Sequence, residues 1–152
     1  MTLLEQACKF IAQFEGCKLQ AYTPLEGLAN GYAIGYGFTD RSIQSNTVWT
    51  QAQCDQALQD KVQKIINSLE SVIFTNLNQN QMTAVIDLCY NLGIGAFDRT
   101  SPSLPELLNQ HAFGEFCVHL MKYCYAGKDW LQSLQKRRQA EKDLFLTALN
   151  NN

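Results

Sequence analysis

Apolar side chains recur at helical spacing near the start of the chain. Between residues 3 and 14 they follow one face of a helix: Leu3, Leu4, Ala7, Phe10, Ile11 and Phe14. Glu15 and Gly16 come next, and a glycine permits the positive φ with which many helices end. The pattern therefore predicts an amphipathic helix that holds the Glu15 carboxyl group on its last turn.

A different periodicity follows over residues 18–38. Two strand-like runs, at 19–22 and 32–38, are joined by a polar, glycine-rich loop that carries a second carboxylate, Glu26. Gly35 and Gly37 alternate with larger residues in the second run, which leaves one face bare for a ligand or another backbone. Strands this short must pack on helices, so we predict a small antiparallel sheet beside a helical part.

The rest of the chain is typical of helices. One is predicted to begin at Thr50, with Gln53 completing a capping box, and to extend to about Phe74. The next is capped by Asn78 and Gln81 and is apolar on almost every side, so it is predicted to be buried. Weaker patterns predict the remaining elements: a glycine-rich stop at 91–95, a loop over 99–105, short helices over 104–108 and 113–123, a turn at 127–129 and a last helix from about 134.

These elements predict an α+β fold that is mainly helical, with the helix that is apolar all round at its centre. We expect a single domain over residues 1–152, which is long enough to bury a core. A sheet lobe at about 16–48 is expected beside a helical lobe at about 50–149, which also takes in the N-terminal helix. Such a segregated layout favours a cleft between the sheet and the helices.

Composition narrows the classes of function. The formal net charge is −2, so no overall basic field draws the chain to nucleic acid. Six cysteines are scattered at apolar positions without a Cys-x-x-Cys pair. This spacing favours reduced thiols over three disulfides and disfavours a zinc site.

The first residues, MTLLEQACKFIAQFEG, lack the basic segment and the small-residue cleavage site of a signal peptide. No apolar run approaches the length of a membrane span. We therefore expect a protein without a signal peptide that stays in the cytoplasm as synthesised and has no stable membrane insertion.

Four stretches together resemble a known family, the phage-type lysozymes or endolysins of glycoside hydrolase family 24. They are Phe14-Glu15-Gly16 with Leu19, Ala21 and Tyr22; AIGYGFT at 33–39; YNLGIGAF at 90–97; and LQKRRQAEKDLF at 134–145. The resemblance implies a lysozyme-like fold and hydrolysis of the β-1,4 bond between N-acetylmuramic acid and N-acetylglucosamine in bacterial peptidoglycan. It also implies a monomer that needs no cofactor and that reaches the periplasm of the host bacterium after a partner such as a holin permeabilises the membrane.

Carried over by position, the resemblance makes Glu15 the general acid and Arg137 the residue that orients it, with Arg138 as the alternative. Two other positions depart from the family pattern. Pro24 stands where the family has an aspartate, and Ala33 stands where it has a threonine. Neither side chain can activate or hold a water molecule. Phe38, which follows Gly37 where the family has a histidine or similar residue, is a minor departure.

Glu26 is the candidate for the missing carboxylate, because it lies two residues past the expected position on a longer loop. Asp40 is a weaker candidate, and Thr23 or Thr39 could replace the threonine. We predict that Gly35, Tyr36 and Thr39 bind or orient the substrate.

Two functions from different classes follow. The first is an active muramidase that uses Glu15 with a rearranged partner. The second is a catalytically silent lysozyme-fold protein that binds peptidoglycan or a protein partner. An unrelated role, such as a toxin domain or a small-molecule binder, stays open. Binding of a chitooligosaccharide without turnover discriminates the silent protein from the enzyme.

Overall fold

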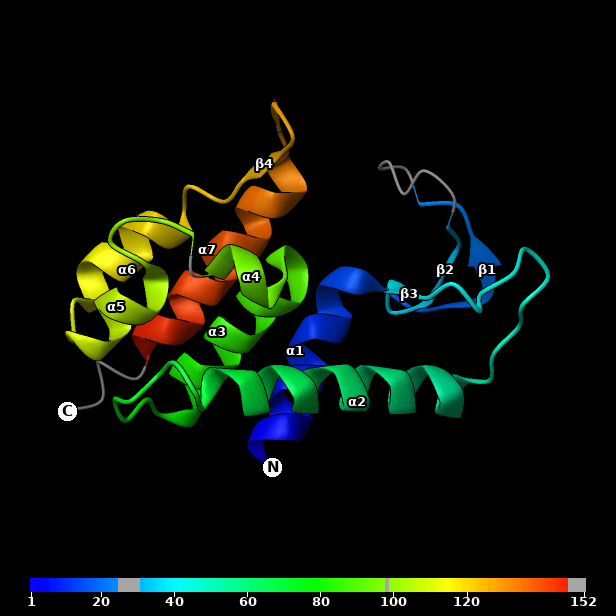
Figure 1. The fold of residues 1–152 in the computed structure, drawn as a ribbon, viewed down its shortest axis with the longest axis horizontal. Coiled ribbons are helices and arrows are strands. Elements are labelled where there is room, and N and C mark those ends of the chain that lie inside the picture. Colours follow the sequence, from blue (N-terminus) through cyan, green and yellow to red (C-terminus); the bar gives the residue numbers. More distant parts are fainter. Residues whose placement is uncertain (25–30, 98, 148–152) are drawn as a thin grey trace. The chain divides into compact units, whose positions relative to one another are not determined.

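The computed structural model describes residues 1–24, 31–97 and 99–147 (Figure 1). The chain divides into two compact units, Met1–Gln63 and Lys64–Asn152, called unit 1 and unit 2 below. The division falls inside a long helix. Each unit is described by itself, and the expectation of a single domain over residues 1–152 stays a prediction.

Unit 1 begins with helix α1, Leu3–Glu15, followed by a three-stranded antiparallel sheet in the order β1-β2-β3. The strands are β1, Lys18–Tyr22; β2, Ala33–Gly35; and β3, Phe38–Thr39. Residues 47–49 add to the outer edge of β1, where the Trp49 amide donates to the Leu19 carbonyl at 2.8 Å. The second of the two predicted runs is divided into β2 and β3, and the predicted small antiparallel sheet is confirmed.

Helix α2, Gln51–Leu69, starts in unit 1 and crosses into unit 2. Its predicted capping box is confirmed, because Thr50 and Gln53 exchange backbone-to-side-chain hydrogen bonds of 2.8 and 3.2 Å. The predicted end at about Phe74 is wrong. The side chain of Asn109 accepts from the Phe74 amide at 2.7 Å and donates to the Val72 carbonyl at 2.9 Å, which fixes this segment as a turn.

Unit 2 is built on helix α3, Gln79–Leu92. Every residue from Gln81 to Tyr90 except Met82 is buried. The predicted cap is confirmed, since Asn78 and Gln81 form a capping box. The predicted glycine stop is also confirmed, because Gly93 ends the helix at φ 84°. A short helix that the sequence did not predict, α4, Ile94–Phe97, follows directly.

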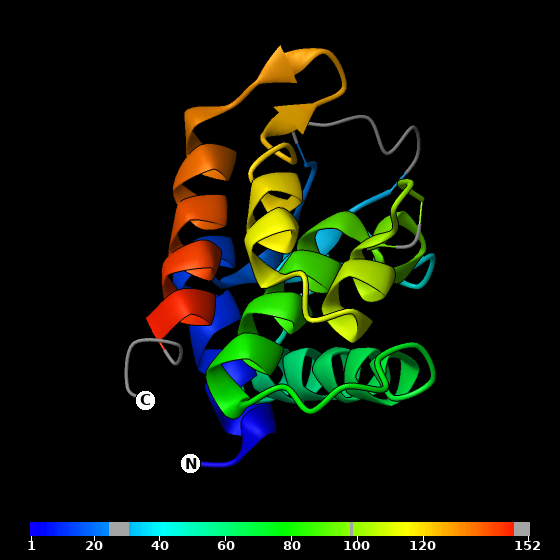
Figure 2. The same ribbon diagram turned by 90° about the vertical axis from the view of Figure 1, so that its left-hand side faces the viewer.

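The remaining elements of unit 2 are mostly helical (Figure 2). They are α5, Leu104–Asn109; α6, Phe113–Leu120; the hairpin strands β4, Tyr125–Ala126, and β5, Asp129–Trp130; and α7, Gln132–Thr147. The sequence predicted the turn between β4 and β5 but not the strands, and it placed the end of α6 three residues too late. With these differences, the mainly helical α+β prediction is confirmed. Among the described residues, no helix has the length and apolar character that spanning a bilayer requires.

Helices α3 and α7 pack against each other around buried charges. Arg137 on α7 donates from Nε and Nη2 to the two carboxylate oxygens of Asp87 on α3, at 2.9 and 2.8 Å. The next residue of α7, Arg138, donates to Glu141 three positions further along, and both side chains are fully buried. Burial raises the pKa of Glu141, and a hydrogen bond with Asp87 raises it further.

Replacing Asp87 with alanine leaves the Arg137 guanidinium buried without its bidentate carboxylate. We expect Asp87→Ala to lower the free energy of unfolding by about 3–5 kcal/mol, as for other broken buried ion pairs. Urea unfolding followed by circular dichroism measures the change. The exposed Asp143→Ala on α7 is the matched control, and an equal loss in both variants would contradict a special role for the buried pair.

Candidate active site

The Glu15 carboxyl group is held at the end of a helix fixed at both ends. At the start of α1, Thr2 and Glu5 form a capping box. At its end, Gly16 takes φ 61° and its amide donates to the Ala12 carbonyl at 3.4 Å. Glu15 is the last residue of the helix and is half-buried. As the sequence predicts, a glycine cap sets the position of this side chain.

The turn between β2 and β3 meets the Glu15 carboxylate at Gly37. A Cβ atom added to Gly37 would lie 3.3 Å from Glu15 Oε2, and Gly37 has φ 76°. A side chain at this position would be both strained and crowded against the carboxylate. The sequence singled out Gly37 only for its alternation with larger residues, and the structure shows which group needs the space.

Tyr22 on β1 is a second neighbour of Glu15. Burial raises the pKa of the Tyr22 phenol, and the charge of Glu15 raises it further. Lys18 Nζ lies 4.0 Å from the centre of the same ring, a cation–π contact. The phenol therefore keeps its proton at neutral pH, which leaves a hydroxyl group close to the carboxylate.

Gly35 lies on β2 and has φ 65°. The space beside its Cα is filled by the protein itself, because an added Cβ would lie 3.4 Å from Cys54 Sγ and 3.6 Å from the Trp49 ring. The sequence predicted that a ligand or another backbone would come close here, whereas the structure places two side chains beside Gly35. The predicted role of Gly35 in binding or orienting the substrate stays a prediction.

Tyr36 joins the sheet to α2 by hydrogen bonds. Its hydroxyl donates to Asp55 Oδ1 at 3.0 Å, and Gln51 Nε2 donates to both the Tyr36 hydroxyl, at 3.1 Å, and Asp55 Oδ1, at 2.7 Å. Burial, followed by the bond to Asp55, raises the pKa of Tyr36 to about 12. This network holds the β2–β3 turn, and with it Gly37, against α2. The predicted substrate-binding role of Tyr36 stays a prediction.

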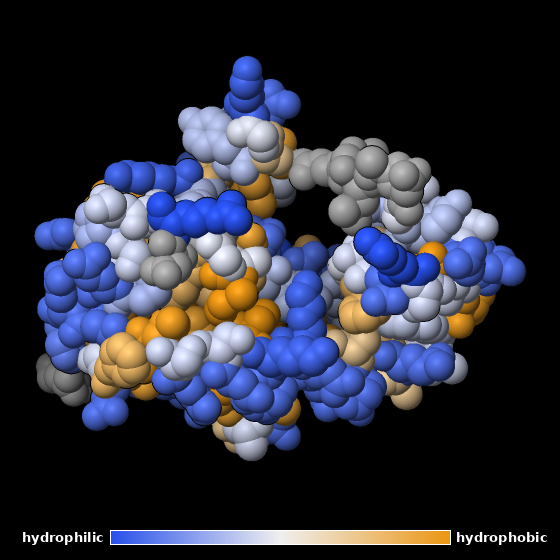
Figure 3. All heavy atoms as spheres, viewed as in Figure 1, coloured by the Kyte–Doolittle hydropathy of each residue, from blue (hydrophilic) through white to orange (hydrophobic). Residues whose placement is uncertain are grey.

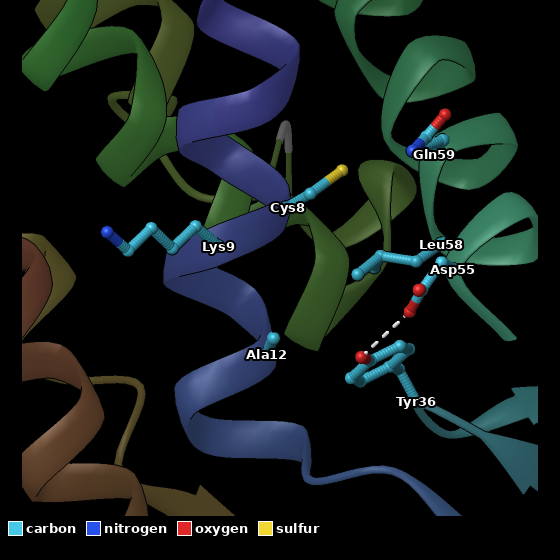
Figure 4. A pocket seen from close by; sticks show the side chains of 7 residues that line it. All are labelled: Cys8, Lys9, Ala12, Tyr36, Asp55, Leu58 and Gln59. Atoms are coloured by element: carbon cyan, nitrogen blue, oxygen red, sulfur yellow. Dashed lines mark hydrogen bonds between the residues drawn. The ribbon is translucent and has the colours of Figure 1, made fainter. Parts of the chain in front are cut away.

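The Tyr36–Asp55 bond borders a pocket of about 210 Å³ in unit 1. In Figure 4 the Tyr36 and Asp55 side chains point toward each other, and the Lys9 side chain points away from them. Burial, and then the Asp55 charge, raises the pKa of Cys8, another lining residue, to about 11. The thiol therefore stays protonated at neutral pH. Among the described residues that line the pocket, Asp55 is the one carboxylate, and its Oδ1 is engaged by Tyr36 and Gln51. These lining residues therefore lack the pair of carboxyl groups that glycoside hydrolysis uses.

Ala33 and Thr39, two positions that bear on the missing threonine, face each other across the sheet. Ala33 on β2 pairs with Thr39 on β3, and only 2% of Ala33 is exposed. Directly opposite residues of an antiparallel pair project from the same face, with Cβ atoms about 4.5–5.5 Å apart. The exposed Thr39 thus brings a hydroxyl group to the face of the sheet on which the Ala33 methyl group lies.

The candidates for the missing aspartate have different outcomes. Glu26 lies outside the described residues, so its role as the second carboxylate stays a prediction. Pro24 is half-buried beside the end of β1. Asp40 is exposed and accepts from the Ser42 amide at 2.8 Å, a bond that lowers its pKa. That carboxylate therefore caps its own turn.

Arg137 belongs to unit 2 and Glu15 to unit 1, so the proposed orientation of Glu15 by Arg137 stays a prediction, as does the cleft between sheet and helices. The structure gives Arg137 a partner that the sequence analysis missed, Asp87. A signal for it existed, since Asp87 is the only charged residue of α3. The alternative, Arg138, is held by Glu141.

The contact between Gly37 and Glu15 can be tested by stability alone. Gly37→Ala is expected to cost about 1–2 kcal/mol of unfolding free energy from the positive φ, plus a term from crowding Glu15. Gly93→Ala is the matched control, because it has a similar φ and an open Cβ position. In a double-mutant cycle with Glu15→Ala, Gly37→Ala should couple by about 0.5 kcal/mol or more and Gly93→Ala should not. Additive effects at Gly37 would contradict the contact.

The chain is similar in sequence to endolysins of several phages. The chain is 34% identical to an endolysin of Lactococcus phage c2 over its whole length, and 29% identical to one of Bacillus phage B103, but it spans only 63% and 57% of those two proteins. It is also 34% identical to the endolysin of Acyrthosiphon pisum secondary endosymbiont phage 1, with 97% of this chain and 100% of that protein covered.

Solved structures with the same fold include two of similar size. The muramidase domain of SpmX from Asticaccaulis excentricus has a TM-score of 0.80 at 28% identity, covering 92% of this chain and 94% of that one. An endolysin from Escherichia coli phage FAHEc1 has a TM-score of 0.83 at 24% identity, covering 97% and 95%, and shows the fold alone. The lysozyme-like fold is thereby confirmed. The sequence model of the phage lysozyme family matches residues 12–141, and the chain belongs to that family.

Proposed function

We propose that this protein is a peptidoglycan muramidase that hydrolyses the β-1,4 bond between N-acetylmuramic acid and N-acetylglucosamine. The observation that carries the proposal is the seat of Glu15: the last residue of a capped helix, half-buried, with Oε2 beside Gly37. Catalytic carboxyl groups need such a rigid position. Similarity to endolysins of several phages and to a muramidase domain supports the same reaction.

In the proposed mechanism Glu15 gives its proton to the glycosidic oxygen as the bond to C1 breaks. The oxocarbenium-like sugar is then attacked by water, whose proton passes to a second carboxylate. Glu26 is the proposed base, and an inverting geometry requires it to lie about 6.5–9.5 Å from Glu15. Thr39 is proposed to orient the water, because its hydroxyl group lies on the face of the sheet where Ala33 offers only a methyl group. The reaction needs no cofactor.

Synthesis in the cytoplasm of a host bacterium and action in the periplasm after permeabilisation of the membrane are part of the same proposal. We expect the protein to act as a monomer on the wall.

A second candidate is a silent lysozyme-fold protein that binds peptidoglycan or a protein partner. Pro24 and the buried Ala33 favour it, because they remove a carboxylate and a hydroxyl group from the family's positions. A silent protein would bind chitooligosaccharide and leave it intact, whereas the proposed enzyme would bind and cleave it.

Glu15→Gln is expected to lower the initial rate of lysis of permeabilised Gram-negative cells by about 10²–10⁴, because the amide cannot donate the proton. The rate is measured as loss of turbidity beside the wild type. Glu70→Gln, an exposed position in unit 2, is the control and should lyse cells normally. A wild type that leaves turbidity unchanged at micromolar concentration would favour the silent protein.

Glu26→Gln should also lower the rate by about 10²–10⁴ if this residue is the base. Asp40→Asn is the matched variant, and we expect it to keep the wild-type rate because Asp40 caps its own turn. The opposite result, a slow Asp40→Asn and a normal Glu26→Gln, would move the role of base to Asp40.

A further inference from the structure

The hairpin of β4 and β5 holds two large aromatic residues side by side. Tyr125 pairs with Trp130 and Ala126 with Asp129, which leaves Gly127 and Lys128 as a two-residue loop. Gly127 has φ 62°, as the first position of a type II′ turn requires. The Leu131 amide extends the pairing with a 2.9 Å bond to the Cys124 carbonyl. Because opposite residues share a face, the Tyr125 and Trp130 rings project from the same side of the hairpin.

Both rings are open to solvent. Tyr125 is 58% exposed and Trp130 is 49% exposed. The hairpin projects beyond the ends of α6 and α7 in Figure 2. In Figure 3, the tip of the projection at the top, where Figure 1 places β4, is blue and pale, with tan and orange residues below it. About half of each residue therefore stays open to solvent, although aromatic residues bury large areas where they pack fully.

Helix α7 begins directly after the hairpin and carries amide groups near its start. Gln132 follows Trp130 by two residues, and Gln135, Lys136 and Gln139 line a hollow of about 240 Å³ on the same helix. Residues three, four and seven positions after Gln132 lie on one face of a helix. Gln139 also donates to Asp143 at 2.7 Å. Of the described residues that line the hollow, none carries a carboxylate.

We propose that Tyr125 and Trp130, with Gln132, Gln135, Lys136 and Gln139, form a binding surface for a peptidoglycan strand on unit 2. The faces of sugar rings present C–H groups that stack on aromatic rings. Their hydroxyl and acetamido groups match the glutamine amides, which both donate and accept. The carboxylates of muramic acid and of the stem peptides match Lys136 and Lys128, and Asp129 is the one opposing charge on the hairpin.

The identity of the ligand rests on the proposed function, whereas the surface itself does not include Glu15. Its role would be to hold the strand while bonds are cleaved, so that the enzyme stays on the polymer between cleavages. A protein partner, or a second copy of this chain, would use the same rings differently, because it would not need the amide-lined hollow.

The first test uses Glu15→Gln, so that the polymer stays intact, and purified insoluble sacculi as the probe. Adding Tyr125→Ala and Trp130→Ala together should weaken retention on sacculi about tenfold, the size expected for loss of two stacking rings. Phe74→Ala, which removes an aromatic ring that is 80% exposed elsewhere on unit 2, is the control. Equal retention of the double-alanine variant and of the control would overturn the proposal.

The second test measures the fluorescence of Trp130 in the proposed binding surface. The chain has two tryptophans, so Trp49→Phe leaves Trp130 as the single reporter. Soluble uncross-linked glycan strands should shift Trp130 emission to the blue and protect it from acrylamide quenching. Unchanged emission at saturating glycan, or concentration-dependent self-association that the Tyr125→Ala and Trp130→Ala changes abolish, would overturn the proposal. Loss of turbidity by the wild type tests the proposed function separately, since a protein without lytic activity can still hold sacculi through these rings.

Discussion

The candidate site depends on one close approach, that of the Glu15 carboxylate to the backbone at Gly37. Glu15 Oε2 comes within 3.3 Å of the place where any other residue at 37 would have its Cβ. The approach requires that α1 end at Glu15 and that the β2–β3 turn be held in place. The Gly16 cap meets the first requirement, and the bonds of Tyr36 to Asp55 and Gln51 meet the second. Features that look unrelated in sequence thus serve the position of one carboxylate.

Unit 2 depends on a different feature, a group of charged side chains buried between two helices. Four ionisable side chains of α3 and α7 are buried together: Asp87, Arg137, Arg138 and Glu141. Removing charges from water is costly, and the bidentate Arg137–Asp87 pair offsets part of that cost. Burial raises the pKa of Glu141, which lowers the cost of keeping that carboxyl group out of water. The pair also fixes the direction of the Arg137 guanidinium, whereas the guanidinium of a surface arginine would not be fixed in this way.

Much of this fold could be predicted from the sequence, because the residues that begin and end a helix are close to it in the sequence. The caps at Thr50 and Asn78 and the glycine stop at Gly93 were predicted correctly from neighbours within a few positions. The end of α2 was not, because Asn109 sets it from 35 positions away. The β4–β5 hairpin was missed because strands of two residues have no periodicity to detect.

The same distinction holds for the site. Glu15 could be found because its glycine cap is adjacent, and Arg137 because it lies in a recognisable stretch. The side chains that contact Gly35, Tyr36 and Arg137 come from other elements, so no local sequence pattern indicates these contacts. Asp87 is the exception, since one charge in an apolar helix already indicates a buried partner.

Pro24 and Ala33 stand where the resemblance to the family predicts an aspartate and a threonine, and the sheet register bears on how the change at position 33 can be offset. Ala33 lies between two strands, opposite Tyr22 on one side and Thr39 on the other. A hydroxyl group lost from the middle strand therefore has a phenol and a threonine hydroxyl as its nearest cross-strand replacements. Of the two, the Tyr22 phenol is near the Glu15 charge and keeps its proton, while Thr39 is exposed and able to meet water. We propose that the water-orienting role lies with Thr39 on β3, which pairs with Ala33 without any change in the fold, so the loss of the threonine alone does not make the silent protein the better proposal.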